Sequence, residues 1–211
     1  MAGEQRDFDG AAATWDENPG RVKMAHDVAG AIRDTLRPGL GTEVVDFGCG
    51  TGLLSLALLP SVRSVTAVDS SKGMLGVLDA KIAAKNLANI RTLLVDVEKG
   101  DPLPGPADLV ISSMTFHHLR DIRPVLAEMA RVLRPGGRIA IADLDSDEGK
   151  FHDSPEGVFH NGFDRCTMQK CLEAAGFGEI RNRTAAIVHK PGPSGEVRMF
   201  TVFLMTATKK A

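Results

Sequence analysis

The sequence feature that most constrains the fold of this chain is a glycine-rich turn between an apolar strand and a helix. The stretch reads VVDFGCGTGLLSLAL over residues 44–58, and its three glycines stand at alternate positions, 48, 50 and 52. Glycine adopts positive φ angles without steric cost and has no side chain to keep a ligand away from the backbone. A strand-to-helix turn of this kind predicts an α/β protein that holds a cofactor at the turn.

Strand patterns and helical patterns alternate on both sides of this turn. Strands are predicted at 43–47, 64–68, 90–95, 107–112 and 138–144, and helices from Pro19 to before Pro38 and at 53–59, 71–86, 121–133 and 167–175. The alternation is typical of a parallel sheet covered by helices on both faces. Two further strand-like runs, 179–189 and 197–208, are joined by a short Pro/Gly-rich segment, which permits only an antiparallel pair.

Length and composition narrow the class of protein. The chain has 211 residues and a net charge of −2, without a run of Lys and Arg, so we expect one domain and no nucleic-acid partner. We expect no membrane span, because no apolar stretch approaches the roughly 20 residues that a span needs. The three cysteines, Cys49, Cys166 and Cys171, fit neither a metal knuckle nor a redox motif. Reduced cysteines in a cytoplasmic protein are therefore expected.

The residues around the turn discriminate among cofactors. A dinucleotide fingerprint, GxGxxG, would place its third glycine where this chain has Leu53, and no Lys-Ser/Thr pair follows as in a P-loop. Asp46, before the first glycine, suits a ligand with a cationic end. Asp69 ends the next predicted strand and can accept hydrogen bonds from both hydroxyls of a ribose. Asp96 ends the third predicted strand and can accept one from an adenine amino group.

Taken together, these motifs resemble the class I S-adenosylmethionine-dependent methyltransferases. The resemblance rests on DFGCGTG at 46–52, Asp69, LLVDVE at 93–98 and RVLRPGGRIAIAD at 131–143. FHHLRD at 116–121 and AATWDE at 12–17 are most similar to the small-molecule branch that includes the ubiquinone and menaquinone C-methyltransferases. The resemblance implies a three-layer α/β/α Rossmann-like fold, with a seven-stranded, mostly parallel sheet and an antiparallel C-terminal strand.

The same resemblance implies positions for the cofactor. The glycines would admit its methionyl part, Asp69 would hold the ribose, Met74 would lie against the adenine, and Asp96 with the Val97 amide would read the adenine edge. The implied cofactor-binding residues are Asp46, Gly48, Cys49, Gly50, Gly52, Asp69, Ser70, Met74, Asp96, Val97 and Ser112. The alternative for the acids and glycines is turn-making and capping, and for Met74 it is a position in the core.

The acceptor side carries weaker signals. From Ser112 the chain reads SSMTFHHL, and it lacks the Asn/Asp-Pro-Pro-Tyr/Phe sequence found there in enzymes that methylate nucleic-acid bases or glutamine amides. His117 and His118 are the candidate catalytic residues. Alternatively, both histidines hold their loop through backbone hydrogen bonds.

Two segments are expected to cover the acceptor. Residues 1–37 would form an N-terminal lid and helix, and residues 144–178 a substrate-covering insertion. The candidate substrate residues are Trp15, His117, His152, His160 and Phe163, with Phe159 beside them. Trp15 is alternatively a core anchor. A divalent metal held by Asp145, Asp147, Glu148 and His152 is a further alternative, but we predict no metal, because clustered loop acids are usually solvated.

The expected function is transfer of a methyl group from S-adenosylmethionine to a small-molecule acceptor, with release of S-adenosylhomocysteine. Three alternatives stay open on the sequence: a protein or RNA methyltransferase, a catalytically silent cofactor-binding protein, and a nicotinamide oxidoreductase. The sequence leaves the acceptor atom and the oligomeric state open, because the fold serves O-, N-, C- and S-methylation alike.

Overall fold

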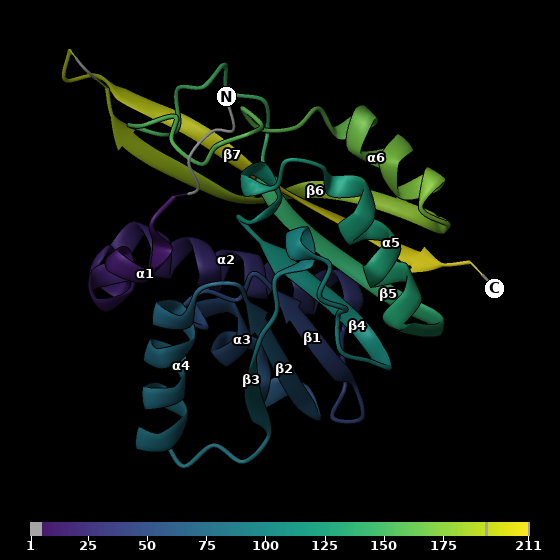
Figure 1. Ribbon diagram of the computed structural model, residues 1–211. Coiled ribbons are helices and arrows are strands. Elements are labelled where there is room, and N and C mark those ends of the chain that lie inside the picture. Colours follow the sequence, from purple (N-terminus) through teal and green to yellow (C-terminus); the bar gives the residue numbers. More distant parts are fainter. Residues whose placement is uncertain (1–5, 193, 211) are drawn as a thin grey trace.

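One seven-stranded sheet forms the centre of the molecule in the computed structural model, which describes residues 6–192 and 194–210 (Figure 1). The strand order is β3-β2-β1-β4-β5-β7-β6. The strands are β1 (Glu43–Phe47), β2 (Ser64–Asp69), β3 (Ile90–Leu94), β4 (Ala107–Ser113), β5 (Leu133–Leu144), β6 (Phe177–Pro191) and β7 (Val197–Lys209). Strand β7 is antiparallel to both neighbours, and the other pairs are parallel, so the predicted fold class is confirmed.

The helices follow the predicted pattern with small changes at their ends. They are α1 (Phe8–Ala11), α2 (Pro19–Leu36), α3 (Leu53–Leu58), α4 (Lys72–Ala84), α5 (Ile122–Val132) and α6 (Arg165–Ala174), with short 3-10 turns η1 (Ala12–Glu17), η2 (Leu59–Ser61), η3 (Val97–Lys99) and η4 (Phe116–His118). The side chain of Asn18 caps α2 by accepting hydrogen bonds from the amides of Gly20 and Arg21. None of the helices in the described residues is long and apolar enough to cross a membrane.

The end of α5 differs from the prediction. We expected glycine caps at 136 and 137 and a strand that begins at 138, but the helix ends at Val132 and β5 begins at Leu133 in an extended conformation. Leu133 pairs with Ala107 of β4, and the Arg134 guanidinium binds Asp108 at 2.9 Å. These contacts draw the chain into the sheet before the glycines are reached.

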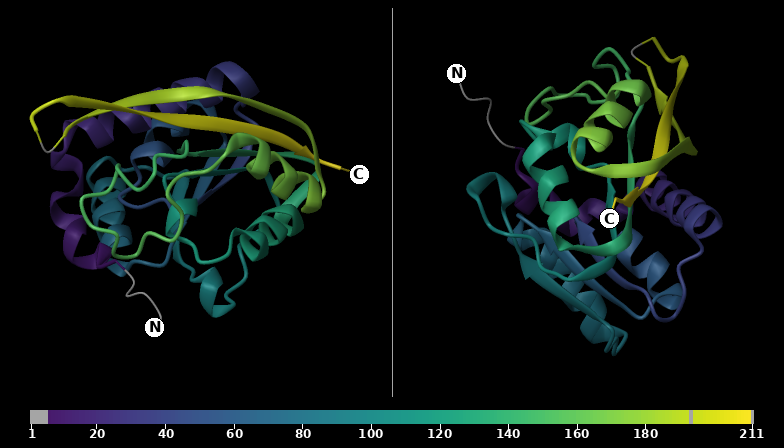
Figure 2. Two further views of the ribbon diagram at one scale, coloured as in Figure 1. Left: turned by 90° about the horizontal axis from the view of Figure 1, so that it is seen from above. Right: turned by 90° about the vertical axis from the view of Figure 1, so that its right-hand side faces the viewer.

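The two faces of the sheet bury separate apolar clusters, as the alternation of side chains along a strand requires. On β4, Leu109 and Ile111 belong to the cluster under α2, α3 and α4, whereas Val110 belongs to the cluster under α5 and α6. Figure 2 (right) shows α5 and α6, in green, on one side of the sheet and α2, in purple, on the other. The three-layer architecture follows from this double burial.

The carboxyl ends of β1, β2, β3, β4 and β5 share one edge of the sheet, because these strands are parallel. Residues from the N-terminal segment reach this edge. The Asp9 carboxylate accepts hydrogen bonds from the Ser71 hydroxyl at 2.5 Å and from the Gly73 amide at 2.7 Å, which holds α1 beside the start of α4 (Figure 1). Of the predicted lid and helix at 1–37, the structure describes residues 6–37: α1 is held at this edge and α2 packs against the sheet, and residues 1–5 lie outside the described part of the chain.

Candidate functional site

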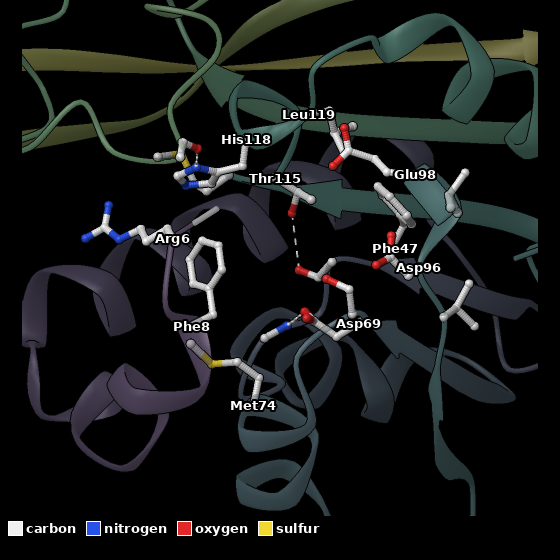
Figure 3. A pocket seen from close by; sticks show the side chains of 17 residues that line it. Arg6, Phe8, Phe47, Asp69, Met74, Asp96, Glu98, Thr115, His118 and Leu119 are labelled. Carbon is white, nitrogen blue, oxygen red and sulfur yellow. Dashed lines mark hydrogen bonds between the residues drawn. The ribbon is translucent and has the colours of Figure 1, made fainter. Parts of the chain in front are cut away.

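A cavity opens at the carboxyl edge of the sheet, beside the glycine turn that joins β1 to α3 (Figure 3). Its walls come from the N-terminal segment, the ends of the first four strands, the start of α4, the region around η4 and the loop after β5. The lining residues are Arg6, Phe8, Phe47, Gly48, Gly50, Asp69, Ser70, Met74, Val95, Asp96, Val97, Glu98, Met114, Thr115, His118, Leu119 and Gly157.

The three glycines of the turn differ in whether a side chain could fit at their positions. Gly48 has a φ of +68°, and a Cβ there would lie 2.3 Å from the Thr115 side chain. Gly52 has a φ of +80°, and a Cβ there would lie 2.3 Å from Leu78. Gly50, at φ +54°, lines the cavity, and a Cβ on it would have the Met74 sulfur at 3.9 Å as its only neighbour within 4 Å. Gly48 and Gly52 are thus required by packing, whereas Gly50 leaves backbone open to a ligand.

The Asp69 carboxylate lies at the floor of this opening. It accepts hydrogen bonds from the Gly50 amide at 2.7 Å and from the Ser71 amide at 2.9 Å, one on each oxygen. Burial raises the pKa of Asp69, although these backbone hydrogen bonds act in the opposite direction. Each oxygen accepts one of these bonds and keeps lone-pair capacity for hydroxyl donors in the cavity (Figure 3).

Asp46 lies behind the turn and is not part of the cavity wall. Its side chain is 1% exposed and accepts a hydrogen bond from the Ser55 hydroxyl at 2.6 Å. Burial raises the pKa of this carboxyl to about 7, and the nearby charge of Asp69 adds to the effect. A cationic ligand beside the turn would favour the ionised form of Asp46.

Asp96 and Val97 line the opposite side of the cavity from the end of β3. Asp96 caps η3, and its carboxylate accepts from the Lys99 amide and pairs with the Lys99 ammonium at 2.7 Å. Met74 is 2% exposed, and Ser70 stands next to Asp69. Of the predicted cofactor residues, seven line the cavity: Gly48, Gly50, Asp69, Ser70, Met74, Asp96 and Val97.

Four predicted cofactor residues lie outside the lining: Asp46, Cys49, Gly52 and Ser112. The Ser112 hydroxyl donates to the Phe47 carbonyl at 2.8 Å, which ties β4 to the end of β1. Burial raises the pKa of the Cys49 thiol, which contacts the Gly50 carbonyl at 3.6 Å. In this structure both side chains hold the turn in place and are directed away from the cavity.

The two adjacent histidines have different surroundings. His118 lines the cavity, and its Nδ1–H donates to the Gly157 carbonyl at 2.6 Å. Burial lowers the pKa of His118 to about 3, so that the imidazole is neutral at pH 7. His117 is 1% exposed and does not line the cavity.

His117 pairs with a buried acid that sequence reasoning missed. Its Nδ1–H donates to the Asp143 carboxylate at 2.6 Å, at the end of β5. Burial raises the pKa of Asp143, but the charge and the hydrogen bonds of His117 outweigh it and leave that pKa below its ordinary value. The available signal was an acid at the end of the apolar run IAIAD, in the same strand-end position as Asp46, Asp69 and Asp96.

The other residues missed in the sequence belong to the covering segments and the strand-four loop. Phe8 lines the cavity and meets the His118 ring edge-on, with ring centroids 5.0 Å apart. Arg6 and Thr115 also line it, and the Thr115 hydroxyl donates to the Gly48 carbonyl at 3.2 Å. No spacing or motif marks these positions, because the fold alone brings the N-terminal segment to the cavity.

The predicted substrate residues of the later loop are not in the cavity wall. The His152 ring packs against His117, with centroids 4.9 Å apart, and burial lowers its pKa to about 4. Phe163 is buried under α5 and α6 and is tied by its amide to the Leu144 carbonyl. The His160 ring stacks near Phe163, with centroids 5.0 Å apart. Phe163 is therefore a core residue and His160 packs on it, and neither residue lines the cavity.

Trp15 also lies outside the lining. The guanidinium of Arg21 stacks over its ring at 3.8 Å from the centroid, and the Phe8 ring meets it edge-on at 6.0 Å. Trp15 contacts Phe8, which lines the cavity, but does not itself form part of the cavity wall.

The alternative metal set of loop acids is dispersed. Asp145 forms a bidentate ion pair with Arg165 at 2.7 Å, Asp147 accepts from the Phe151 amide at 2.6 Å, and Glu148 pairs with Lys150 at 2.5 Å. In the described part of the chain these acids do not converge with His152 on a common point.

Comparison with known proteins identifies the sequence class. The methyltransferase domain family matches residues 44–137. An uncharacterized methyltransferase of Geobacillus kaustophilus is 32% identical over 164 residues, which cover 74% of this chain and 71% of that protein. An uncharacterized methyltransferase of Schizosaccharomyces pombe is 31% identical over 136 residues, 58% of this chain and 48% of that protein. Malonyl-[acyl-carrier protein] O-methyltransferase of Hahella chejuensis is 36% identical over 140 residues, 65% of this chain and 48% of the enzyme.

This chain thus spans about half the length of the last two relatives, at 48% of each. Solved structures share the fold at low identity. A chain from the Haloferax volcanii complex of the Trm112 methyltransferase activator has a TM-score of 0.77 at 19% identity, covering 98% of this chain and 99% of that one. Phosphoethanolamine N-methyltransferase 2 of Haemonchus contortus, solved with S-adenosylhomocysteine and phosphomonomethylethanolamine, has a TM-score of 0.69 at 16% identity, covering 87% and 52%.

Proposed function

Because the chain belongs to the class I S-adenosylmethionine-dependent methyltransferases, we propose that it transfers the methyl group of S-adenosylmethionine to a small-molecule acceptor and releases S-adenosylhomocysteine. The observation that carries the proposal is the convergence, on one cavity, of the open Gly50 backbone and the carboxylates of Asp69 and Asp96. A methionyl chain, a ribose and an adenine need these three kinds of group in this order.

The cofactor is assigned to the cavity part by part. The backbone of Gly48 and Gly50 would hold the methionyl portion, and the cationic ammonium or sulfonium would favour the ionised form of the buried Asp46 behind the turn. The Asp69 carboxylate would accept from the two ribose hydroxyls, and Met74, Asp96 and Val97 would hold the adenine. This assignment matches each charged part of the ligand to a complementary group, which is the usual source of orientation in such pockets.

The reaction in this arrangement is an in-line displacement. When bound, S-adenosylmethionine would supply an activated methyl group for displacement by the acceptor atom, and S-adenosylhomocysteine, a neutral thioether, would leave. The cofactor carries the activated group, so the protein contributes alignment and exclusion of water. The apolar side chains of Phe8, Phe47, Met114 and Leu119 in the cavity wall support the second role.

His118 is the residue best placed to orient an acceptor. Its Nδ1–H is used by Gly157, so its Nε2 carries a lone pair that can accept a hydrogen bond. A pKa of about 3 makes this imidazole a weak base at pH 7, which favours orientation of the acceptor over removal of its proton. His117, buried behind it and fixed by Asp143, supports the position of His118 through ring contact at 4.1 Å between centroids.

A small acceptor is favoured by the way the cavity is closed. Phe8 and Arg6 line the cavity from the predicted lid at 1–37, and Gly157 lines it from the predicted insertion at 144–178, which supports a covering role for these parts of the two segments. The name of one similar protein, which N-methylates phosphoethanolamine, points to a free small molecule. Another, which O-methylates a malonyl group on a carrier protein, points to a small reacting group but not to a free acceptor. We also place the activity in the cytoplasm, with no nucleic-acid partner.

The test supplies the enzyme with S-adenosylmethionine labelled in the methyl group and with separated metabolite, protein and RNA fractions of a cell extract. We expect label in the metabolite fraction with the wild-type protein and a large reduction with Asp69→Asn. Label in the protein or RNA fraction would contradict the small-molecule assignment. Absence of transfer to any fraction, with S-adenosylhomocysteine binding intact, would favour a catalytically silent cofactor-binding protein.

A further inference from the structure

Three histidines from separate parts of the chain meet beside the cavity. His117 and His118 belong to η4, and His152 belongs to the loop after β5. One ring nitrogen of each lies within 4.8 Å of the others, and the ring centroids are 4.1 to 5.5 Å apart. Within the described residues this is the one group of His, Cys, Asp and Glu side chains with the spacing of a metal site.

Two nitrogens of this cluster are buried without a hydrogen-bond partner. They are His117 Nε2 and His152 Nε2, and the His117 side chain is 1% exposed. A buried polar atom without a partner costs free energy, so an unpaired ring nitrogen in a native structure requires an explanation. A metal ion bound by both nitrogens would explain them, with His152 in the tautomer that carries its proton on Nδ1.

The Nδ1 atoms of His117 and His118 already form hydrogen bonds within the protein. His117 Nδ1–H donates to the Asp143 carboxylate, and His118 Nδ1–H donates to the Gly157 carbonyl, each at 2.6 Å. With Nδ1–H engaged in this way, Nε2 is the nitrogen of each ring that can offer a lone pair to a metal ion. Metal-ligating histidines almost always have their second nitrogen bound to a carboxylate or a backbone carbonyl in this manner.

We propose that His117, His118 and His152 bind one divalent transition-metal ion, of which Zn²⁺ is the representative, through their Nε2 atoms. Neutral imidazoles select ions of this class, whereas Mg²⁺ and Ca²⁺ select oxygen ligands. Three histidines on zinc leave a fourth position for water or for another ligand. Because His118 also lines the cavity, the ion lies at the border of the proposed acceptor site, and its open position then replaces the His118 lone pair as the contact for the acceptor.

Binding requires two local adjustments. Nitrogens around a tetrahedral zinc ion lie roughly 3.3 Å apart, so the cluster contracts from its present spacing by rotation of the side chains. Arg6, whose guanidinium is 3.4 Å from His152 Nδ1, turns away, because that nitrogen carries a proton when Nε2 holds the metal. The carboxylate of Asp143 compensates part of the added charge.

The test is metal binding by the full chain without an affinity tag and without cofactor. The protein is freed of metal with a chelator, dialysed against Zn²⁺ of known free concentration and assayed for bound metal, and circular dichroism checks the fold of each variant. We expect one equivalent in the wild type, at least a tenfold weaker affinity in His152→Gln, and a tenfold to hundredfold weaker affinity in Asp143→Asn. His189→Gln, an exposed histidine outside the cluster, serves as the matched control and binds like the wild type.

The proposal is overturned if the wild type binds no more Zn²⁺ than His152→Gln, or if His189→Gln weakens binding as much as His152→Gln. If Asp143→Asn does not fold, His152→Gln decides the outcome alone, since its side chain is only half-buried in a loop. The measurement uses no S-adenosylmethionine, so its failure leaves the proposed methyl transfer standing.

Discussion

The Nδ1 atom of His117 lies 2.6 Å from Oδ1 of Asp143, and neither side chain is more than 1% exposed. The Asp143 carboxylate also accepts from the amides of Leu144 and His117 itself. One buried acid at the end of β5 therefore fixes the turn that carries both histidines. Breaking such a pair leaves polar groups buried without partners, which is more costly than the loss of an exposed ion pair.

We expect Asp143→Asn to lower the free energy of unfolding by about 3 kcal/mol, because the amide replaces an acceptor of backbone hydrogen bonds with a donor. Urea unfolding at pH 7 measures this change. Asp34→Asn, at an exposed position of α2, is the control and should shift stability by less than about 0.5 kcal/mol. Equal effects of the two substitutions would contradict the structural role of the pair.

Substitutions at two glycines of the turn should affect different properties: Gly48→Ala mainly stability, and Gly50→Ala mainly cofactor affinity. Gly48→Ala places a Cβ 2.3 Å from Thr115 at positive φ, so we expect a stability loss of about 2 kcal/mol or more. Gly50→Ala meets only the Met74 sulfur at 3.9 Å, so we expect a loss of about 1 kcal/mol from backbone strain but at least a tenfold weaker affinity for S-adenosylhomocysteine. Thermal unfolding and calorimetric titration of both variants test the pair. A Gly50→Ala variant with wild-type affinity would show that the cofactor does not approach this backbone.

Asp46 predicts a stability that depends on pH. Burial raises its pKa from 3.8 to about 7, so the folded protein holds this proton more tightly than the unfolded chain does. Its contribution is complete below about pH 4 and is lost as the pH rises to about 7. Asp46→Asn removes the dependence while an oxygen remains for the Ser55 hydroxyl. From pH 5 to pH 7.5, the variant should therefore gain on the order of 2 kcal/mol relative to the wild type without cofactor.

Urea unfolding of the wild type and Asp46→Asn at these two pH values measures that difference. Other titrating groups, such as His118, contribute equally to both proteins and cancel. A difference between the two proteins that stays constant with pH would mean that Asp46 titrates near its ordinary value.

The contact of the N-terminal segment with α4 should control how fast S-adenosylhomocysteine dissociates. Asp9 joins α1 to the start of α4 through Ser71 and Gly73, and Phe8 next to it lines the cavity. Asp9→Ala should release this contact and raise the dissociation rate of S-adenosylhomocysteine about fivefold to tenfold. Stopped-flow displacement measures the rate, and Glu17→Gln, an exposed change in the same segment, is the control. Equal rates for Asp9→Ala and the wild type would remove the covering role of residues 6–17.

Most of the fold was predictable because local patterns and tertiary packing agree. The alternating strand residues of β4 and β5 divide between the two apolar clusters, and the short connection between β6 and β7 permits only an antiparallel pair. The start of β5 was not predictable from the Pro-Gly-Gly run, because the pairing of Leu133 with Ala107 depends on a residue distant in sequence.

The candidate site was predictable where chemistry is encoded in a local motif. Gly48, Gly50, Asp69 and Asp96 follow strand ends that the sequence marks clearly, and the structure brings them to one cavity. Ser112 and Cys49 lie near these residues in the sequence pattern, but their side chains bond to backbone carbonyls of the turn and do not line the cavity. Sequence spacing does not specify the direction of a side chain. Contacts such as His117 with Asp143, and the approach of His152, depend on loops whose path only the folded chain defines.

Calorimetric titration of S-adenosylhomocysteine into the wild type and into Asp69→Asn is the decisive test of the cofactor site. We expect binding of one molecule per chain by the wild type and a tenfold to hundredfold weaker affinity in the variant, because hydrogen bonds from the ribose to a charged acceptor are lost. NAD⁺ should not bind to either protein. Absence of S-adenosylhomocysteine binding by the wild type, or equal affinity for both proteins, would contradict the assignment of Asp69 and of the cavity to this cofactor.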